Sequence, residues 1–342
     1  MKIEFGIGMG RNERMDEVGE ISRVAEESGF SLITFVDEPF LARDVHVMCT
    51  VAALNTTRAR IGQGVVDPLT YHPSAIANAA ASLNELTGGR AFLGLGAGGP
   101  AGKVMQPIPH KDLREAVTFV RKFMAGEEAE YRGSKMRSEW IRRPVPLYLA
   151  AEGPLSLQLV GEVADGTIFM GGPPELVRWK LQQIEKGALR VGRDPSKIDI
   201  WVRSVIVVAE SKEKALREAA GHLPGISLLD TYSKIADKHP ELAAFYRKLE
   251  SEQPGILGEM RKIVDAFDPM WFEHIEAPAA RLATQRIVDY MNLAGTPDDI
   301  CDGIHRLARV GVRRIATDNY TIIDKKGMLR EIGDRIMPHF RN

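Results

Sequence analysis

The sequence predicts a (β/α)8 barrel, in which eight parallel strands alternate with helices, with a helical insertion after the seventh strand. Three observations lead to this fold class. Short apolar runs alternate with stretches of helical periodicity along the chain. With 342 residues and 44% hydrophobic composition, the chain can bury a substantial core. Right-handed crossovers make a closed barrel the simplest arrangement of so many units, although an open doubly wound sheet also fits the alternation.

The first half of the chain contains four apolar runs that are expected to form strands. The clearest unit comprises a strand over Ile61–Val66, a helix over Pro73–Leu86 and a strand over Ala91–Leu95. Proline suits the first turn of that helix, and Gly88-Gly89 suits its end. The other elements expected here are strands over Ile3–Met9 and Leu32–Val36 and helices over Asp16–Ser28, Val45–Leu54 and Leu113–Met124.

The second half continues the alternation around two irregular stretches. Residues 126–144 are charged and are expected to cross the surface without regular structure. Residues 211–292 hold too much sequence for one crossover, so we expect a helical insertion there, within a single domain over residues 1–342. The expected strands are Val145–Ala150, Gly166–Met170, Ile198–Val208 and Arg313–Thr317, and the expected helices follow Pro154 and cover Leu176–Val191, the stretch after Thr296 and Met328–Ile336.

Composition excludes several classes of function. A formal net charge of −1 argues against a nucleic-acid partner. No stretch approaches the roughly 18 continuous apolar residues of a membrane helix, and the N-terminus has the pattern of a first strand rather than of a signal peptide. Cys49 and Cys301 offer neither a disulfide framework nor zinc-ligand spacing, and the histidines are scattered. We therefore expect a cytoplasmic protein without a metal site.

Glycines follow several predicted strands, at the edge where parallel α/β folds bind ligands. Gly64, Val65 and Asp67 lie at the end of the third strand, and Gly96, Ala97 and Gly98 follow the fourth. Residues 94–99 match G-x-G-x-x-G formally, but prolines intervene before the next helix and no strand-terminal acid follows at the Rossmann distance. This glycine-rich edge either lets a flat ring or a phosphate come close to the backbone, or it is an ordinary turn.

Two later turns share one pattern, in which glycine precedes the start of a helix. The residues Ala151, Glu152 and Gly153 precede one helix, and Gly171 and Gly172 precede another. Glycine permits close approach to the backbone, and a helix N-terminus offers unpaired N–H groups to a phosphate. Ordinary short loops are the alternative.

The clearest acid–base candidates are Asp37 and Glu38, at the end of the second strand. Adjacent carboxylates repel, so one of them can keep a proton near neutral pH and donate it. Helix capping or a salt bridge is the alternative. His72 precedes Pro73 and is either a donor to a ring carbonyl or substrate, or a loop residue. Asp67 lies close to His72 in the sequence and could orient either the ring carbonyl or the substrate.

Three stretches together resemble the bacterial luciferase-like superfamily. They are residues 61–99 (IGQGVVDPLTYHPSAIANAAASLNELTGGRAFLGLGAGG), 145–172 (VPLYLAAEGPLSLQLVGEVADGTIFMGG) and 293–315 (LAGTPDDICDGIHRLARVGVRRI). Within it, the chain is most similar to the coenzyme F420-dependent branch, which includes methylenetetrahydromethanopterin reductases and F420-dependent dehydrogenases. The resemblance covers nearly all of the chain outside residues 211–285.

This resemblance implies a deazaflavin ring at the carboxyl ends of the strands and a non-proline cis peptide at Gly64-Val65. It places Asp37 near the pyrimidine side of the ring, and Gly153, Gly171 and Gly172 near the phosphate. It also implies a homodimer or higher homo-oligomer. Two departures stand out, because the branch commonly has histidine at the position of Glu38 and often has a glutamate in the loop that reads Gly98-Gly99-Pro100-Ala101 here.

The resulting hypothesis is an F420-dependent oxidoreductase that transfers a hydride between the deazaflavin and a small organic substrate, such as a pterin-linked one-carbon carrier. Glu38 is the expected proton handler. The alternative is an FMN-dependent monooxygenase of luciferase type, which uses reduced flavin and O2 and usually a partner reductase. A third hypothesis is a flavin-binding barrel that has lost its chemistry.

Overall fold

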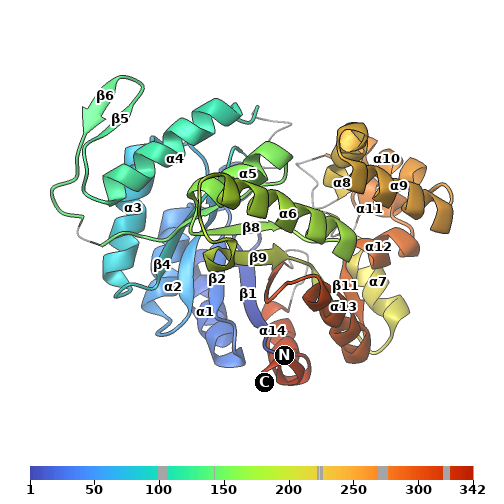
Figure 1. The fold of residues 1–342 in the computed structure, drawn as a ribbon. Helices are drawn as coiled ribbons and strands as arrows, with labels where there is room; N and C mark the ends of the chain where they lie inside the picture. The colour runs from blue at the N-terminus through green and yellow to red at the C-terminus, as the bar shows by residue number, and fades with distance from the viewer. Residues whose placement is uncertain are drawn as a thin grey trace. The chain divides into compact units, whose positions relative to one another are not determined.

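The computed structural model describes residues 1–98, 106–141, 143–221, 223, 226–268, 276–318 and 324–341. Eight strands are hydrogen-bonded into a closed barrel in the order β1-β12-β9-β8-β7-β4-β3-β2, which confirms the predicted fold class (Figure 1). The barrel strands are β1 (Glu4–Met9), β2 (Leu32–Phe35), β3 (Arg60–Val66), β4 (Ala91–Leu95), β7 (Leu147–Leu149), β8 (Gly166–Met170), β9 (Asp199–Arg203) and β12 (Arg314–Asp318).

The chain contains two compact units. The N-terminal unit comprises residues 5–169 and 183–201, and the C-terminal unit comprises residues 1–4, 170–182 and 202–342. No helix in the described parts of either unit is long and apolar enough to cross a membrane.

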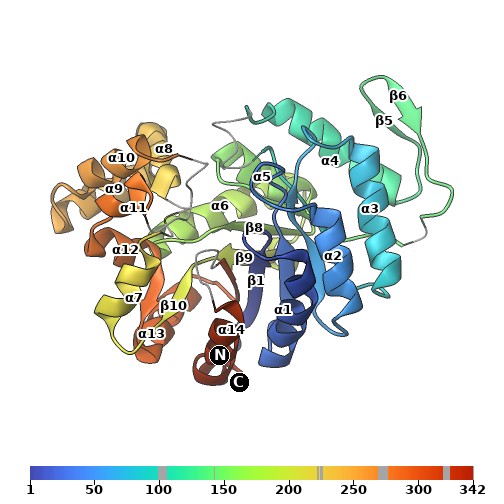
Figure 2. The same ribbon diagram turned by 180° about the vertical axis from the view of Figure 1, so that it is seen from behind.

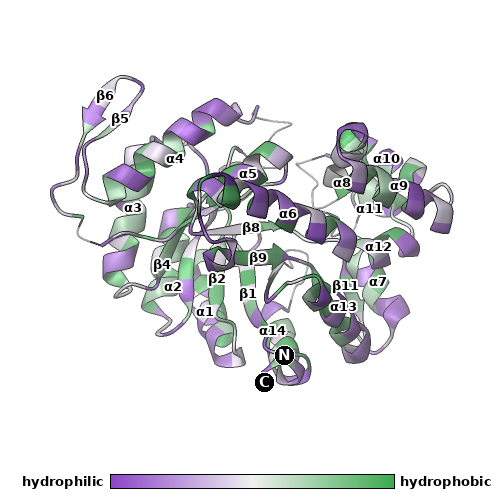
Figure 3. Cartoon of the chain, viewed as in Figure 1, coloured by the Kyte–Doolittle hydropathy of each residue, from purple (hydrophilic) through white to green (hydrophobic). Residues whose placement is uncertain are grey.

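In the N-terminal unit, parallel strands alternate with helices that cover them (Figure 2). Strand residues are almost entirely buried, and the covering helices alternate hydrophobic with hydrophilic residues, as Figure 3 shows. The pairing of β3 with β4 shifts register between Gln63 and Val66. The helices of this unit are α1 (Met15–Ser28), α2 (Val45–Leu54), α3 (Pro73–Leu86), α4 (His110–Met124) and α5 (Pro154–Val163).

Four side chains fill the N-terminal end of these strands and are called the basal cluster: Arg60, Tyr148, Asp199 and Trp201. The guanidinium of Arg60 donates to the Tyr148 hydroxyl at 2.6 Å and to Asp199 Oδ2 at 2.8 Å. Trp201 is fully buried, and its ring lies 5.6 Å from the Arg60 guanidinium carbon. Gly6 makes room for this ring, because a Cβ there would lie 2.9 Å from Trp201.

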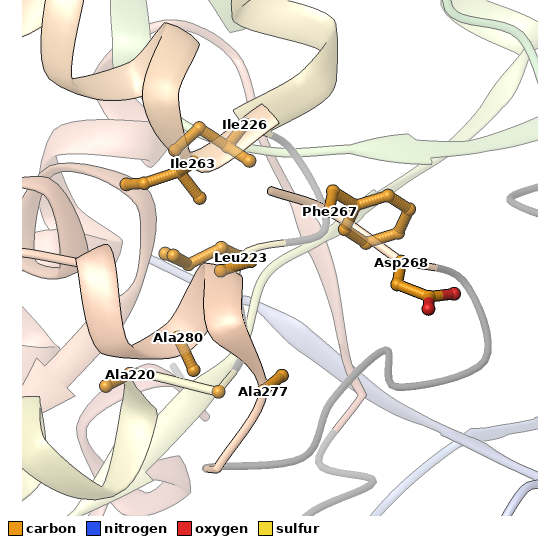
Figure 4. A pocket seen from close by; sticks show the side chains of 10 residues that line it. Ala220, Leu223, Ile226, Ile263, Phe267, Asp268, Ala277 and Ala280 are labelled. Atoms are coloured by element: carbon orange, nitrogen blue, oxygen red, sulfur yellow. The ribbon is translucent and has the colours of Figure 1, made fainter. Parts of the chain in front are cut away.

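The C-terminal unit contains the start of α6 (Pro174–Arg190) and the expected helical insertion. Helices α8, α9 and α10 of the insertion lie together in both views (Figures 1 and 2). Between α8, α10 and α11 is a small apolar pocket of about 20 Å³, with Asp268 at its rim (Figure 4). The helices are α7 (Lys212–Ala219), α8 (Ile226–Ile235), α9 (Pro240–Glu252), α10 (Ile256–Asp265), α11 (Pro278–Leu282), α12 (Gln285–Met291), α13 (Pro297–Arg309) and α14 (Lys325–Arg335), with short 3-10 turns at Ala236–Lys238 and Met337–Phe340. Another short 3-10 turn, at Pro195–Lys197, belongs to the N-terminal unit.

Two expectations about local structure were wrong. The single strand expected over Ile198–Val208 is two strands, because β10 (Ile206–Val208) leaves the barrel and pairs with β11 (Leu293–Gly295) in a separate sheet. The chain changes its strand partner at Ile206, whose amide donates a hydrogen bond to the Thr317 hydroxyl. The charged stretch 126–144 contains a hairpin of β5 (Ala129–Tyr131) and β6 (Ser134–Met136) instead of being irregular.

Candidate functional site

The site residues predicted from the sequence lie at the carboxyl ends of the strands, and most of them belong to the N-terminal unit. Their side chains are held by the loops after β1, β2 and β3. We call four of the residues there the mouth cluster: Arg11, Asp37, Glu38 and Thr70.

Arg11 and Glu38 form a buried ion pair in the mouth cluster. The two residues are 8% and 7% exposed, and the guanidinium meets both carboxylate oxygens, with Nη2 2.7 Å from Oε1 and Nε 2.5 Å from Oε2. The turn after β1 makes this possible, because Gly10 adopts φ of 128° and its amide donates to Glu13. Glu38 therefore realises the salt-bridge alternative, and its charge is matched inside the protein.

Asp37 is the titratable member of the mouth cluster. It is half-buried, and burial raises its pKa to about 6, with the negative charges of Asp67, Asp44 and Glu38 adding smaller effects. A hydrogen bond donated by the Thr70 hydroxyl, 3.2 Å from Oδ2, acts in the opposite direction. One carboxyl of the Asp37-Glu38 pair can thus hold a proton near neutral pH, as expected, but desolvation is the main cause rather than repulsion between neighbours.

The Asp67 side chain forms hydrogen bonds within its own loop. Its Oδ1 accepts from the amides of Leu69 and Thr70, at 2.9 and 3.2 Å. This arrangement is an Asx turn, and it presents the Thr70 hydroxyl to Asp37. Asp67 therefore acts on Asp37 through the loop it folds and through its charge.

The peptide bond between Gly64 and Val65 is cis, which confirms the expectation drawn from the family resemblance. Val65 is half-exposed, and the place where a Cβ of Gly96 would stand is 2.7 Å from Val65 Cγ2 and 3.8 Å from Ala150 Cβ. The ends of β3, β4 and β7 thus meet around Val65. A side chain at Gly96 would collide with Val65, so the position needs glycine.

Gln63, next to this peptide, is a buried polar residue that the sequence did not single out. It is 1% exposed, its Nε2 lies 3.3 Å from His46 Nδ1, and no described residue hydrogen-bonds its Oε1. Burial lowers the pKa of His46, against the opposing charge of Asp44. The Gln63 carbonyl oxygen is therefore an unused acceptor beside the cis peptide.

His72 does not join the mouth cluster in the structure. It is exposed and caps α3, with Nδ1 accepting from the Ser74 amide at 3.2 Å. Its ring packs edge-on against Tyr131, with ring centroids 5.3 Å apart, and Phe119 lies 6.2 Å away. These contacts correspond to the structural alternative considered for this histidine.

The turn before α5 has open space at its glycine. Gly153 caps this helix without a side-chain hydrogen bond, and an added Cβ would meet nothing within 4 Å. Ala151, just before it, is buried, and Glu152 is half-buried. The backbone here is accessible to a phosphate at the positive end of a helix dipole.

The remaining predicted glycines serve different purposes. Gly98 faces Leu69 and Pro107, each 3.4 Å from its would-be Cβ, and Ala97 accepts from the Ile108 amide. In the C-terminal unit, Gly171 is buried, and a side chain there would collide with the Ser204 hydroxyl. Gly172 adopts φ of 119° and is half-buried. The rest of the predicted acid-free loop, residues 99–101, lies outside the described residues.

Sequence reasoning missed Arg11, Thr70 and Gln63. An arginine directly after a strand resembles a solvated surface residue, and only the strand-end position and the preceding glycine distinguish Arg11. Thr70 and Gln63 acquire their roles from tertiary contacts, for which a single sequence contains no signal.

Comparisons with known proteins agree on one family. The family described as luciferase-like monooxygenase matches residues 2–314. A 5,10-methylenetetrahydromethanopterin reductase of Archaeoglobus fulgidus is 26% identical over 99% of this chain and all of its own length. An F420-dependent hydroxymycolic acid dehydrogenase of Mycobacterium tuberculosis is 30% identical over 74% of this chain and 77% of its own. The structure of the coenzyme F420-dependent tetrahydromethanopterin reductase from Methanopyrus kandleri superposes on this chain with a TM-score of 0.77, at 22% sequence identity. The superposition covers 99% of this chain and 100% of the reductase chain.

Proposed function

Because the chain belongs to the luciferase-like family, we propose that it is an F420-dependent oxidoreductase whose substrate is a small organic molecule of the pterin-linked one-carbon type. The observation that carries this proposal is the titratable Asp37 beside the cis Gly64-Val65 peptide. The full-length match to a methylenetetrahydromethanopterin reductase supports the substrate class. We further propose a single-domain, cytoplasmic homo-oligomer.

The residues present fit a flat ring that carries a phosphate. The buried Gln63 Oε1 accepts no hydrogen bond from the residues that the structure describes and is suited to a ring N–H, and Val65 offers an apolar surface to a ring face. The open backbone at Gly153 suits the phosphate. The deazaflavin, when bound, supplies a carbon that donates or accepts a hydride.

In this proposal the protein contributes proton handling, orientation and exclusion of water. With a pKa of about 6, Asp37 can both hold and release a proton near neutral pH. Glu38 is held in the ion pair with Arg11. The assignment of proton handling therefore moves from Glu38 to Asp37. Asp67 and Thr70 orient Asp37, and His72 contributes to the start of α3.

The test is binding of purified protein to F420 and, separately, to FMN, measured by fluorescence quenching and calorimetry. We expect micromolar or tighter binding of F420 and much weaker binding of FMN. Turnover is then assayed with reduced F420 and a methylene-tetrahydropterin. Preference for FMN with F420-independent oxygen consumption would contradict the proposal.

An FMN-dependent monooxygenase is the second candidate, because the matching family is described as luciferase-like monooxygenase. The same binding experiment separates the two. Oligomeric state is measured by light scattering, and a monomer at micromolar concentration would contradict the proposed homo-oligomer.

A further inference from the structure

Two large apolar side chains are exposed on the loops that carry the mouth cluster. Phe40, in the loop after β2, is 52% exposed, and Leu69, in the loop after β3, is 38% exposed. Apolar surface left in water is unfavourable. Single exposed apolar residues are ordinary on protein surfaces, but two of them beside a candidate site indicate a ligand group that covers them.

Phe40 lies on a turn whose backbone is held in place by Glu38. The carbonyl oxygen of Glu38 accepts from the amides of Leu41 and Ala42, at 2.8 and 2.7 Å. The carboxylate of Glu38 is held in its turn by the buried Arg11. Because the turn is fixed at both the backbone and the side chain of Glu38, it presents Phe40 in one place. A ligand that contacts the ring therefore pays little for ordering this loop.

Leu69 is presented in a similar way by the next loop. Its amide donates to Asp67 Oδ1 at 2.9 Å in the Asx turn, and its Cδ1 lies 3.4 Å from the place where a Cβ of Gly98 would stand. The residue after it, Thr70, donates to Asp37. Leu69 is thus one residue away from the hydrogen bond that holds the titratable carboxyl.

The chemistry of these two loops favours a planar apolar group over a sugar or an aliphatic alcohol. The arginine of the mouth cluster, Arg11, is bound to Glu38, and the Asp67 carboxylate accepts hydrogen bonds within its own loop. The groups that would recognise several hydroxyls are therefore already used. The Phe40 ring has flat faces on which another ring can stack, and the branched side chain of Leu69 can pack against a ring face.

From these observations we infer that Phe40 and Leu69 determine substrate specificity, by binding a planar aromatic or heteroaromatic ring of the substrate beside Asp37. The inference rests on the proposed function, because it takes Asp37 as the group that exchanges a proton with the substrate. It deepens that function by assigning recognition of the ring to two side chains that handle no proton. Because they contact the ring in the same way before and during the reaction, they contribute to binding and not to the chemical step.

The experiment is steady-state kinetics of the full chain with reduced F420 and a methylene-tetrahydropterin. The variants are Phe40→Ala, Phe40→Leu and Phe40→Trp, and the matched control is Leu86→Ala, because Leu86 is 50% exposed at the last residue of α3. We expect Phe40→Ala to raise KM for the pterin about tenfold or more and to leave kcat within about threefold. Phe40→Trp should keep the native KM, Phe40→Leu should lie between, and Leu86→Ala should change neither constant. Melting temperatures verify that each variant folds.

Calorimetric titration with 6-methyl-tetrahydropterin, with and without F420, measures the ring contact without turnover. An unchanged KM in Phe40→Ala, an equal rise in Leu86→Ala, or no saturable binding of the ring in either titration would overturn the inference. Failure of the proposed function would instead appear as absent F420 binding by the unmodified protein. The ring titration then still decides, because loss of affinity in Phe40→Ala with recovery in Phe40→Trp supports the ring contact.

Discussion

The two ends of the strands in the N-terminal unit carry similar residues in different states. The basal cluster and the mouth cluster each contain an arginine in contact with a carboxylate, which is half-buried at the base and buried at the mouth. At the base, Arg60, Tyr148 and Asp199 bind one another, and burial raises the pKa of Tyr148 so that it stays a phenol. At the mouth, Arg11 and Glu38 are matched in the same way, but Asp37 beside them is not.

The difference lies in the partner that each carboxyl finds. Asp199 receives the guanidinium of Arg60 and the indole N–H of Trp201, at 2.8 and 3.4 Å. Asp37 receives one neutral hydroxyl at 3.2 Å. A buried carboxyl without a cation takes up a proton at higher pH. The base thus has a carboxylate paired with a cation, and the mouth has one carboxyl, Asp37, whose raised pKa lets it change state near neutral pH.

The largest expected effect is on turnover, from Asp37→Asn. If Asp37 handles the proton, losing it should lower kcat about 100-fold or more, because general acid–base catalysis contributes that much. Melting temperature at neutral pH should not fall, since the carboxyl is half-buried, makes one hydrogen bond with the described residues, and has a raised pKa that disfavours its ionised form. Steady-state kinetics with reduced F420 and a methylene-tetrahydropterin measures this change.

Glu38→Gln is the matched control, since Glu38 is the neighbouring carboxylate. We expect it to retain kcat within about tenfold while it loses stability, because Arg11 loses its ionic partner. A large loss of kcat in Glu38→Gln with normal turnover in Asp37→Asn would reverse the assignment, in favour of the role first inferred from the sequence.

The second effect is on stability, from Arg60→Met in the basal cluster. Removing one partner of a buried pair leaves the other charge unmatched, which costs roughly 3–5 kcal/mol, and the partial exposure of Arg60 reduces this to about 2–3 kcal/mol. Chemical denaturation measures the loss, with Arg23→Met on an exposed helical pair as the control. Unchanged stability would show that the basal cluster is not structural.

Sequence reasoning succeeded where local signals determine structure. Val45–Leu54, Pro73–Leu86 and Ala91–Leu95 have the predicted bounds, because apolar spacing, the first-turn proline and the closing glycines are adjacent in the chain. The strand expected over Ile198–Val208 divides because its second part pairs with Leu293–Gly295, nearly ninety positions later. No local pattern specifies that partner.

The candidate site was partly predictable for the same reason. The family resemblance identified the Gly64-Val65 peptide, and strand-end position identified Asp37. The burial that changes the pKa of Asp37, and the salt bridge that commits Glu38 to Arg11, depend on how loops from β1, β2 and β3 meet. Those are tertiary properties, so the sequence placed the two carboxyls correctly but could not distinguish their roles.

A third prediction concerns stability against pH. The pKa of Asp37 is about 6 in the folded protein against an ordinary 3.8, so the folded state binds more protons between these values. The contribution of Asp37 to the free energy of unfolding should therefore fall as pH rises from about 4 to 6. Because the group is partly exposed, we expect about 1–2 kcal/mol. The difference in the free energy of unfolding between the native protein and Asp37→Asn isolates this contribution, because the contributions of the other carboxyls are the same in both proteins and cancel. A flat difference across this range would contradict the shift.

The smallest expected effect comes from Thr70→Val. The Thr70 hydroxyl stabilises the ionised form of Asp37, so removing it should raise the pKa of Asp37 further, by up to about one unit. The acidic limb of the kcat profile should move to higher pH, and the maximum rate should stay nearly constant. Thr50→Val, in a helix-internal bond on α2, is the control that should leave the profile in place. A shift to lower pH would mean that the hydroxyl favours the protonated carboxyl. In that case Thr70 would raise the pKa of Asp37 and so enlarge the contrast between the two ends of the strands, instead of reducing it.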